Sequence, residues 1–148
     1  MGVERPKSVL FACSMNAVRS PIAEAIMKHL FGRWVYVDSA GTRRGELDPF
    51  AVVVLDELGI DLSRHVPKTF DDLEDLSYDL IITLAPDAQH RALDLMRHAS
   101  CEVEYWPTLD PTVVEGNRAV RLDAYRQVRD QIRRRIVQRF GEPTGPTV

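Results

Sequence analysis

Short apolar runs alternate along this chain with longer stretches of helical periodicity. Residues 7–12, 34–39, 79–84 and 102–106 are short and rich in apolar or β-branched side chains, as buried strands are. Strands that alternate with helices form βαβ units, in which helices cover a parallel sheet. The sequence therefore predicts an α/β fold with a four-stranded parallel sheet and helices on both faces. The pattern does not specify the order of the strands.

Proline and glycine residues mark the ends of the predicted helices. Ser20-Pro21 predicts a helix start, with Ser20 as the N-cap and Pro21 at the first helical position, and Gly32 predicts its end. Asp48-Pro49 repeats this signature before a helix over 51–58. A helix is also expected from Pro86 to about residue 98. Residues 118–140 carry apolar side chains at three- and four-residue steps, which predicts a long final helix.

Length and charge bound the class of protein. The chain has 148 residues, which suits one domain, predicted over 1–141 with a loose tail at 142–148. No apolar stretch approaches the roughly 20 residues of a membrane helix, so no membrane partner is expected. The net charge of −3 argues against a nucleic-acid partner. With two cysteines and no signal segment, the chain is predicted to be cytoplasmic.

The sequence predicts neither a metal nor a cofactor. Its four histidines are scattered, and none lies at metal-ligand spacing from a cysteine or carboxylate. The many arginines of the last predicted helix are interpreted as a solvated face. The alternatives are an acidic partner or the chain's own acidic cluster near residues 71–79.

The loop after the first predicted strand carries the strongest chemical signal. It reads Cys-Ser-Met-Asn-Ala-Val-Arg-Ser, from Cys13 to Ser20. A loop of this length between a strand and a helix start can turn its N–H groups inward as an anion nest. Arg19 adds a planar fork that matches two oxygens of a tetrahedral anion. The loop is therefore predicted to bind oxyanions such as phosphate or arsenate.

The same surroundings predict a reactive cysteine. A helix N-terminus and a nearby arginine favour the thiolate form of Cys13, which would then lie beneath the bound anion as a nucleophile. Ser20 can donate a hydrogen bond to that sulfur, and Asn16 tolerates the left-handed backbone of a tight loop. The predicted phosphate-binding residues are Ser14, Met15, Asn16, Ala17, Val18 and Ser20.

Three blocks resemble one known superfamily. Residues 9–25 look like the signature of the low-molecular-weight protein tyrosine phosphatases, a superfamily that also contains thioredoxin-coupled arsenate reductases. Residues 39–42 resemble its second block, and Asp110-Pro111 resembles the Asp-Pro of its general acid. The resemblance implies a three-layer sandwich around a four-stranded parallel sheet, with Cys13, Arg19 and Asp110 as the catalytic residues.

Three positions depart from the phosphatase pattern. Met15 stands where phosphatases usually have glycine, and Val18 stands where they often have a second cysteine. Thr112 replaces an aromatic residue that commonly stacks on the substrate ring. Strict preference for phosphotyrosine is therefore not predicted.

Other features resemble the reductase branch, among them Asn16-Ala17, residues 65–68 and Trp106. That branch relays electrons through cysteines after the third strand, and residues 84–93 contain none. Cys101 is interpreted as a small core residue. An internal thiol relay is not expected, although reduction by an external thiol remains open.

The sequence thus predicts a cysteine-dependent phosphatase that hydrolyses phosphotyrosine-type or other aryl phosphate monoesters through a phospho-cysteine. Its partner would be a phosphorylated protein or a small aryl phosphate. The alternatives are an arsenate reductase that uses an external thiol, and a phosphate-binding module without turnover.

Overall fold

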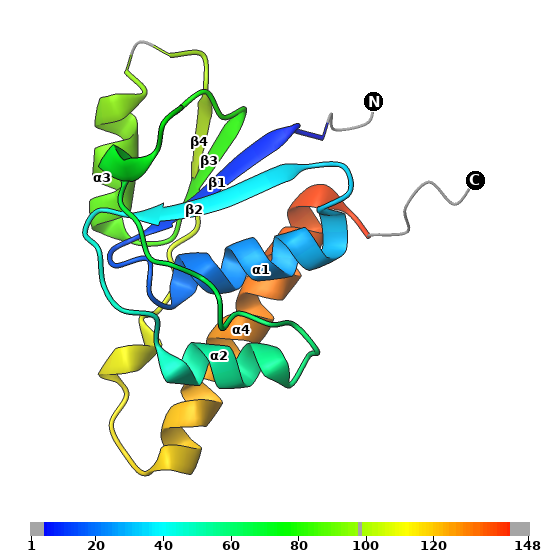
Figure 1. The fold of residues 1–148 in the computed structure, drawn as a ribbon, viewed down its shortest axis with the longest axis vertical. Coiled ribbons are helices and arrows are strands. Elements are labelled where there is room, and N and C mark those ends of the chain that lie inside the picture. Colours follow the sequence, from blue (N-terminus) through cyan, green and yellow to red (C-terminus); the bar gives the residue numbers. More distant parts are fainter. Residues whose placement is uncertain (1–4, 98, 143–148) are drawn as a thin grey trace.

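The computed structural model describes residues 5–97 and 99–142. Four strands alternate with four α-helices, and two short 3₁₀ turns, Phe70–Asp72 and Pro111–Val113, lie in the connections (Figure 1). The strands are β1 (Ser8–Cys13), β2 (Tyr36–Gly41), β3 (Leu80–Thr83) and β4 (Glu102–Tyr105). The helices are α1 (Arg19–Phe31), α2 (Pro49–Asp56), α3 (Pro86–Leu95) and α4 (Arg118–Phe140).

All strands of the sheet are parallel, in the order β2-β1-β3-β4. The predicted four-stranded parallel sheet is therefore confirmed. The chain runs from β1 to β2 on one side and returns to β3 on the other side of β1. This reversal makes the carboxyl end of β1, where Cys13 lies, the switch point at which α/β sheets bind ligands.

The two faces of the sheet have separate cores. Val9 and Phe11 of β1 face the larger core, which α1, α2 and α4 complete. Leu10 and Ala12 face the smaller core, which contains α3. Figure 1 shows α3 on one side of the sheet and the other three helices on the opposite side. Because successive strand residues point to opposite faces, the continuous apolar run of β1 fills both cores.

The start of α1 differs from the prediction. The helix begins at Arg19, and Val18 is the capping residue without a side-chain cap. Ser20 is therefore inside the first turn and is not the N-cap, because its hydroxyl is turned toward Cys13. The end at Gly32 is confirmed, and so is Asp48 as the cap of α2, where its side chain accepts from Phe50 N.

Other boundaries shift by a few residues. Strand β2 starts at Tyr36, two residues after the predicted start, and α3 ends at Leu95 rather than near residue 98. Helix α4 spans the predicted residues 118–140 and ends at Gly141, whose φ is 93°. The predicted tail, apart from Glu142, is outside the described residues. None of the described helices is long and apolar enough to cross a membrane.

Several arginines of α4 bind carboxylates within the chain. Arg126 and Arg129 both donate to Glu57, which follows α2, and these bonds hold the Glu57 pKa at about 2. Arg139 donates to Glu104 of β4 at 2.8 Å. These arginines therefore join α4 to its neighbours, and do not pair with the acidic residues near 71–79.

Candidate active site

In the loop between β1 and α1, several backbone carbonyls are hydrogen-bonded within the described residues, whereas the backbone amides are not. Four of its carbonyls, those of Cys13, Ser14, Met15 and Ala17, accept hydrogen bonds of 2.8–3.2 Å from backbone amides of residues 42–48. By contrast, the backbone N–H groups of residues 14–19 donate to no atom in the described part of the chain. Since unpaired N–H groups at a helix start attract an anion, this loop has the donor set that a tetrahedral oxyanion needs.

Arg19 lies beside this set of amides and is nearly buried. Its Nη1 donates to the carbonyl of Thr108 at 2.9 Å, and its Nη2 lies 3.5 Å from Ser14 Oγ. The same Nη2 is 4.0 Å from Asp110 Oδ2. One guanidinium therefore ties the oxyanion loop to the segment that carries Asp110.

Cys13 is buried at the floor of the loop, with 2% of its surface exposed. Its Sγ lies 2.8 Å from Ser20 Oγ and accepts from Ser20 N at 3.4 Å. Because Ser20 Oγ also accepts a hydrogen bond from Asn16 Nδ2 at 2.9 Å, its own proton is available for the sulfur. Both groups of Ser20 therefore face the sulfur, where they can stabilise negative charge.

Asn16 is fully buried and holds the loop in shape. Its φ is 52°, the one positive φ outside glycine among the described residues. Its Nδ2 donates to Ser20 Oγ and Ser39 Oγ, and its Oδ1 accepts from Lys68 N, all at 2.9 Å. The prediction of a left-handed asparagine is confirmed. Met15, where a glycine is common, does not need this conformation.

His65 and Glu24, whose roles were not predicted from the sequence, complete this network. His65 Nε2 lies 3.0 Å from Asn16 Oδ1, and its Nδ1 lies 3.7 Å from Glu24 Oε1. Ser39 Oγ in turn donates to Glu24. Burial lowers the pKa of His65 and outweighs the attraction of Glu24. A neutral imidazole with its proton on Nε2 can donate to the Asn16 carbonyl.

The contacts of residues 39–42 with the loop explain the residue types found there. A side chain at Gly41 would place its Cβ 2.7 Å from Asn16 N, so only glycine allows this approach to the loop. Thr42 N donates to Cys13 O at 3.1 Å, and the Thr42 hydroxyl lies 3.0 Å from Ser14 O. The block therefore supports the loop from the neighbouring strand.

Asp87, in the first turn of α3, is a third residue of the site that was not predicted from the sequence. Its two oxygens accept hydrogen bonds of 2.7 Å, one from Ser14 Oγ and one from Thr42 Oγ1. Partial burial raises the pKa of Asp87, but these two hydrogen bonds outweigh it and hold the pKa below its ordinary range. Asp87 thus fixes the outer edge of the oxyanion loop.

Asp110 is held by its own loop. Its Oδ1 accepts from Thr112 N at 3.0 Å and from Thr112 Oγ1 at 2.7 Å, whereas its Oδ2 faces Arg19. About 40% of its side chain is exposed. The carboxyl is therefore held in one orientation and is accessible from outside, so a bound group could come within hydrogen-bond reach of it.

A cleft of about 500 Å³ brings the predicted residues together. Cys13, Arg19 and Asp110 line it, with Met15, Ala17 and Val18 from the loop, Thr112 from the 3₁₀ turn Pro111–Val113 and Arg121 from α4. Ser14, Asn16 and Ser20 are outside the lining: Ser14 contacts Arg19 and Ser20 contacts Cys13, whereas Asn16 is connected to Cys13 only through Ser20.

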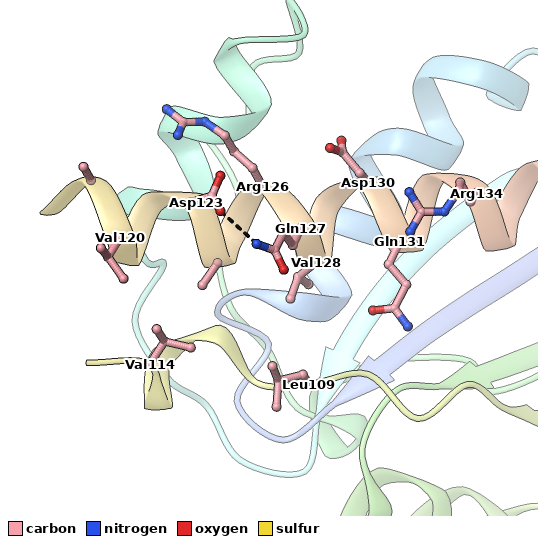
Figure 2. Close-up of a pocket in the computed structure, with 12 residues that line it drawn as sticks. Leu109, Val114, Val120, Asp123, Arg126, Gln127, Val128, Asp130, Gln131 and Arg134 are labelled. Carbon is pink, nitrogen blue, oxygen red and sulfur yellow. Dashed lines mark hydrogen bonds between the residues drawn. The ribbon is translucent and has the colours of Figure 1, made fainter. Parts of the chain in front are cut away.

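A larger hollow, of about 900 Å³, lies on the other side of the Asp110 segment. Figure 2 shows Leu109 and Val114 facing α4 across it, with Gln127 donating to Asp123 on the helix. It contains neither cysteine nor histidine, so the smaller cleft is the candidate active site.

Cys101 is far from Cys13. It precedes β4, and the register of the sheet places it at the same height as the start of β1. Cys13 is at the other end of β1, so the two cysteines are about 16 Å apart along the strand direction. Cys101 is half-buried against the smaller core, where burial raises the pKa of its thiol. Residues 84–93, which contain no cysteine, comprise the two residues before α3 and most of that helix. Across the described ranges, no three His, Cys, Asp or Glu side chains gather as a metal site.

Known proteins share this arrangement. The chain matches the family described as low molecular weight phosphotyrosine protein phosphatase over residues 8–142. It is 36% identical to an arsenate reductase of Bacillus licheniformis over 137 residues, which cover 92% of this chain and 96% of the relative. It is 32% identical to an arsenate reductase of Bacillus subtilis over 130 residues, which cover 88% and 92%.

Solved structures give the same picture. An arsenate reductase in its reduced state superposes with a TM-score of 0.73 at 26% identity, covering 90% of this chain and 96% of that one. The YwlE arginine phosphatase, as a mutant with a phosphorylated active-site serine, superposes with a TM-score of 0.70 at 27% identity, covering 86% and 89%. The relatives include both reductases and phosphatases. The chain belongs to the low molecular weight phosphotyrosine protein phosphatase family.

Proposed function

We propose that this protein is a cysteine-dependent phosphatase that hydrolyses aryl phosphate monoesters, phosphotyrosine among them. The observation that carries the proposal is the pairing of Cys13 with an oriented carboxyl across one oxyanion loop. Asp110 Oδ2 lies 4.0 Å from the guanidinium that borders the free amides above Cys13. A binding module would need the amides and Arg19, but it would have no use for a thiolate or a proton donor.

In the first step, the Cys13 thiolate attacks phosphorus and an S–P bond forms as the ester P–O bond breaks. Asp110 in its protonated form gives its proton to the leaving oxygen. The amides of residues 14–19 and Arg19 bind the equatorial oxygens and stabilise their charge in the transition state.

In the second step, water attacks the phosphorus of the phospho-cysteine. Asp110, now ionised, accepts a proton from this water, and the S–P bond breaks. Inorganic phosphate leaves, and Cys13 returns as a thiolate. Ser20, which donates to the sulfur, stabilises it as the leaving group.

Arsenate reduction is the second candidate, because the named relatives above include arsenate reductases. Here the Cys13 thiolate would displace water from arsenate. An external low-molecular-weight thiol would attack the sulfur, releasing arsenite and leaving a mixed disulfide. A second thiol molecule would reduce it, so that two electrons reach arsenic. The separation of about 16 Å argues against an internal relay to Cys101, since disulfide formation needs Cα atoms within about 7 Å.

The test is a pair of assays on the purified protein. Hydrolysis of p-nitrophenyl phosphate is followed beside arsenate-dependent oxidation of glutathione and of reduced thioredoxin. The proposal expects phosphate release that is lost in Cys13→Ser, with no steady turnover of thioredoxin. Arsenate-dependent thiol oxidation without phosphate release supports the reductase. Phosphate binding without either reaction supports the binding module.

A further inference from the structure

We propose that Arg121, assisted by Arg118, forms a second anion subsite at the mouth of the catalytic cleft. The preferred substrates would then be phosphate monoesters with a further negative charge near the phosphate. This inference rests on the proposed phosphatase function and adds a substrate class to it.

The position of Arg121 is the first argument. Its side chain lines the same cleft as Cys13, Arg19 and Asp110, although it belongs to the first turns of α4. A substrate whose phosphate is bound by the loop would therefore extend its other end toward this arginine. Arg118 is the first residue of the same helix, where the partial positive charge of the helix N-terminus adds to its own.

Both guanidiniums are held by one aromatic ring. Arg121 Cζ lies 4.8 Å and Arg118 Cζ 5.4 Å from the centre of the Phe50 ring. Phe50 itself packs edge-on against Tyr125, with ring centres 5.3 Å apart. A guanidinium that stacks through its face keeps its N–H groups, which lie at the edge, free for a planar anion. Stacking also reduces the rotamer freedom that binding must remove.

The nearby carboxylates do not neutralise Arg121. Asp48 is the half-buried neighbour in the cleft, and both its oxygens accept hydrogen bonds: Oδ1 from Phe50 N at 2.8 Å, and Oδ2 from Tyr125 OH at 2.6 Å. Glu46, Asp110 and Asp123 also face this region or lie close by on α4. Among the described residues, no carboxylate oxygen comes within 4.0 Å of Arg121 or Arg118.

Other arginines of the helix make the contrast clear. Arg126, Arg129 and Arg139 each bind a carboxylate of the chain at 2.8 Å and serve the packing of α4. The larger hollow of Figure 2 has Arg126 and Arg134 beside Asp123 and Asp130, so its charges balance. The catalytic cleft has Arg19 and Arg121 against Glu46, Asp48 and Asp110, so Arg121 differs from the other arginines in lacking a close ion-pair partner and not in the net charge around it.

The ligand that fits is a carboxylate or a second phosphate, since both offer two coplanar or nearby oxygens to the guanidinium fork. Two sources supply this chemistry. One is a phosphotyrosine peptide with a glutamate beside the phosphorylated residue. The other is a small aryl phosphate that carries its own carboxylate.

The experiment compares matched substrates. The kcat/KM for 4-carboxyphenyl phosphate is divided by that for phenyl phosphate, and the same ratio is taken for phosphotyrosine peptides with flanking glutamate or glutamine. In the native protein both ratios exceed one if the subsite serves both sources. Arg121→Ala lowers a ratio about tenfold, the equivalent of one charge-assisted hydrogen bond. Arg118→Ala lowers it less, and Arg133→Ala, on an exposed part of α4, leaves it unchanged.

Binding to Cys13→Ser separates failure of the subsite from failure of catalysis. Calorimetry on this variant measures the affinity for 4-carboxyphenyl phosphate and phenyl phosphate, with and without Arg121→Ala. If this variant binds the carboxylated ligand more tightly and Arg121→Ala removes the preference, the subsite is supported. Absence of hydrolysis of both compounds by the native protein would refute the phosphatase function alone. Equal affinities, or a preference that survives Arg121→Ala, overturn the subsite.

Discussion

Asn16 Nδ2 donates a hydrogen bond to Ser20 Oγ at 2.9 Å, and this bond connects the shape of the oxyanion loop to the chemistry of its cysteine. Ser20 Oγ accepts from Asn16, and its own proton has two acceptors in reach: Cys13 Sγ at 2.8 Å and the more distant Ala40 O at 3.5 Å. The residue that adopts the left-handed turn therefore also holds the serine that contacts the sulfur.

Two substitutions of Asn16 separate these roles. Asn16→Gly accepts the φ of 52° without strain but removes the amide, whereas Asn16→Ala adds strain of roughly 1–2 kcal/mol. We expect both variants to lose at least about tenfold in kcat/KM for p-nitrophenyl phosphate, from the lost hydrogen bonds. Only Asn16→Ala should also show the additional loss in unfolding free energy. Full activity in Asn16→Gly would show that the amide network is dispensable.

Cys13 is predicted to be a reactive nucleophile. At one fixed pH, iodoacetamide should alkylate it faster than it alkylates glutathione, because Ser20 and the helix start stabilise negative charge on the sulfur. Phosphate or arsenate should slow the reaction by occupying the loop. Ser20→Ala should slow the alkylation, and Cys101→Ser is the control that isolates the signal of Cys13. A rate equal to that of glutathione contradicts the prediction.

Asp110 is predicted to be the general acid. Asp110→Asn should slow hydrolysis by ~10²–10⁴-fold for a poor leaving group such as an alkyl alcohol. The loss should shrink with p-nitrophenol, which departs without a proton. Thr112→Val, which removes one of the two bonds to Asp110 Oδ1, should give a smaller effect of the same kind. Near-full activity of Asp110→Asn on the alkyl ester would mean that another residue donates the proton.

Asp87 is predicted to act as a positioning residue for the loop. An amide can accept only one of the two hydrogen bonds from Ser14 and Thr42, so Asp87→Asn should loosen the outer edge of the loop. KM for p-nitrophenyl phosphate should rise several-fold, with a smaller change in kcat. Asp94→Asn, on the exposed side of α3, is the matched control. Equal kinetics in both variants would assign Asp87 a purely structural role.

The sequence could predict the parts of the site that are local in the chain. Cys13, Asn16 and Arg19 stand within seven residues, and the strand before them and the helix after them define their geometry. His65 and Asp87 carry no comparable signal, because their partners Asn16 and Ser14 lie 49 and 73 residues away and meet them only in the folded chain. The signature Ser20-Pro21 was misleading for a physical reason, since the same serine can cap a helix or bind a sulfur.

His65 gives the site a dependence of stability on pH. Its pKa is below the ordinary value of 6.5, because burial lowers it more than the attraction of Glu24 and Asp38 raises it. Repulsion from Lys68 lowers the pKa further. As the pH falls below about 6.5, the unfolded state therefore takes up the proton before the folded state does, and unfolding becomes more favourable. The contribution of His65 to stability is present above that pH and declines below it.

His65→Gln provides the comparison, because glutamine can donate to Asn16 without titrating. We expect the unfolding free energy of the native protein, measured in urea, to fall more steeply between pH 7.5 and 5 than that of the variant. The difference between the two proteins should be constant above pH 7.5, where both side chains are neutral. Curves that run parallel from pH 8 to 5 would show that His65 has the same proton affinity in the folded and unfolded chain, and would remove it from the account of how Asn16 is held.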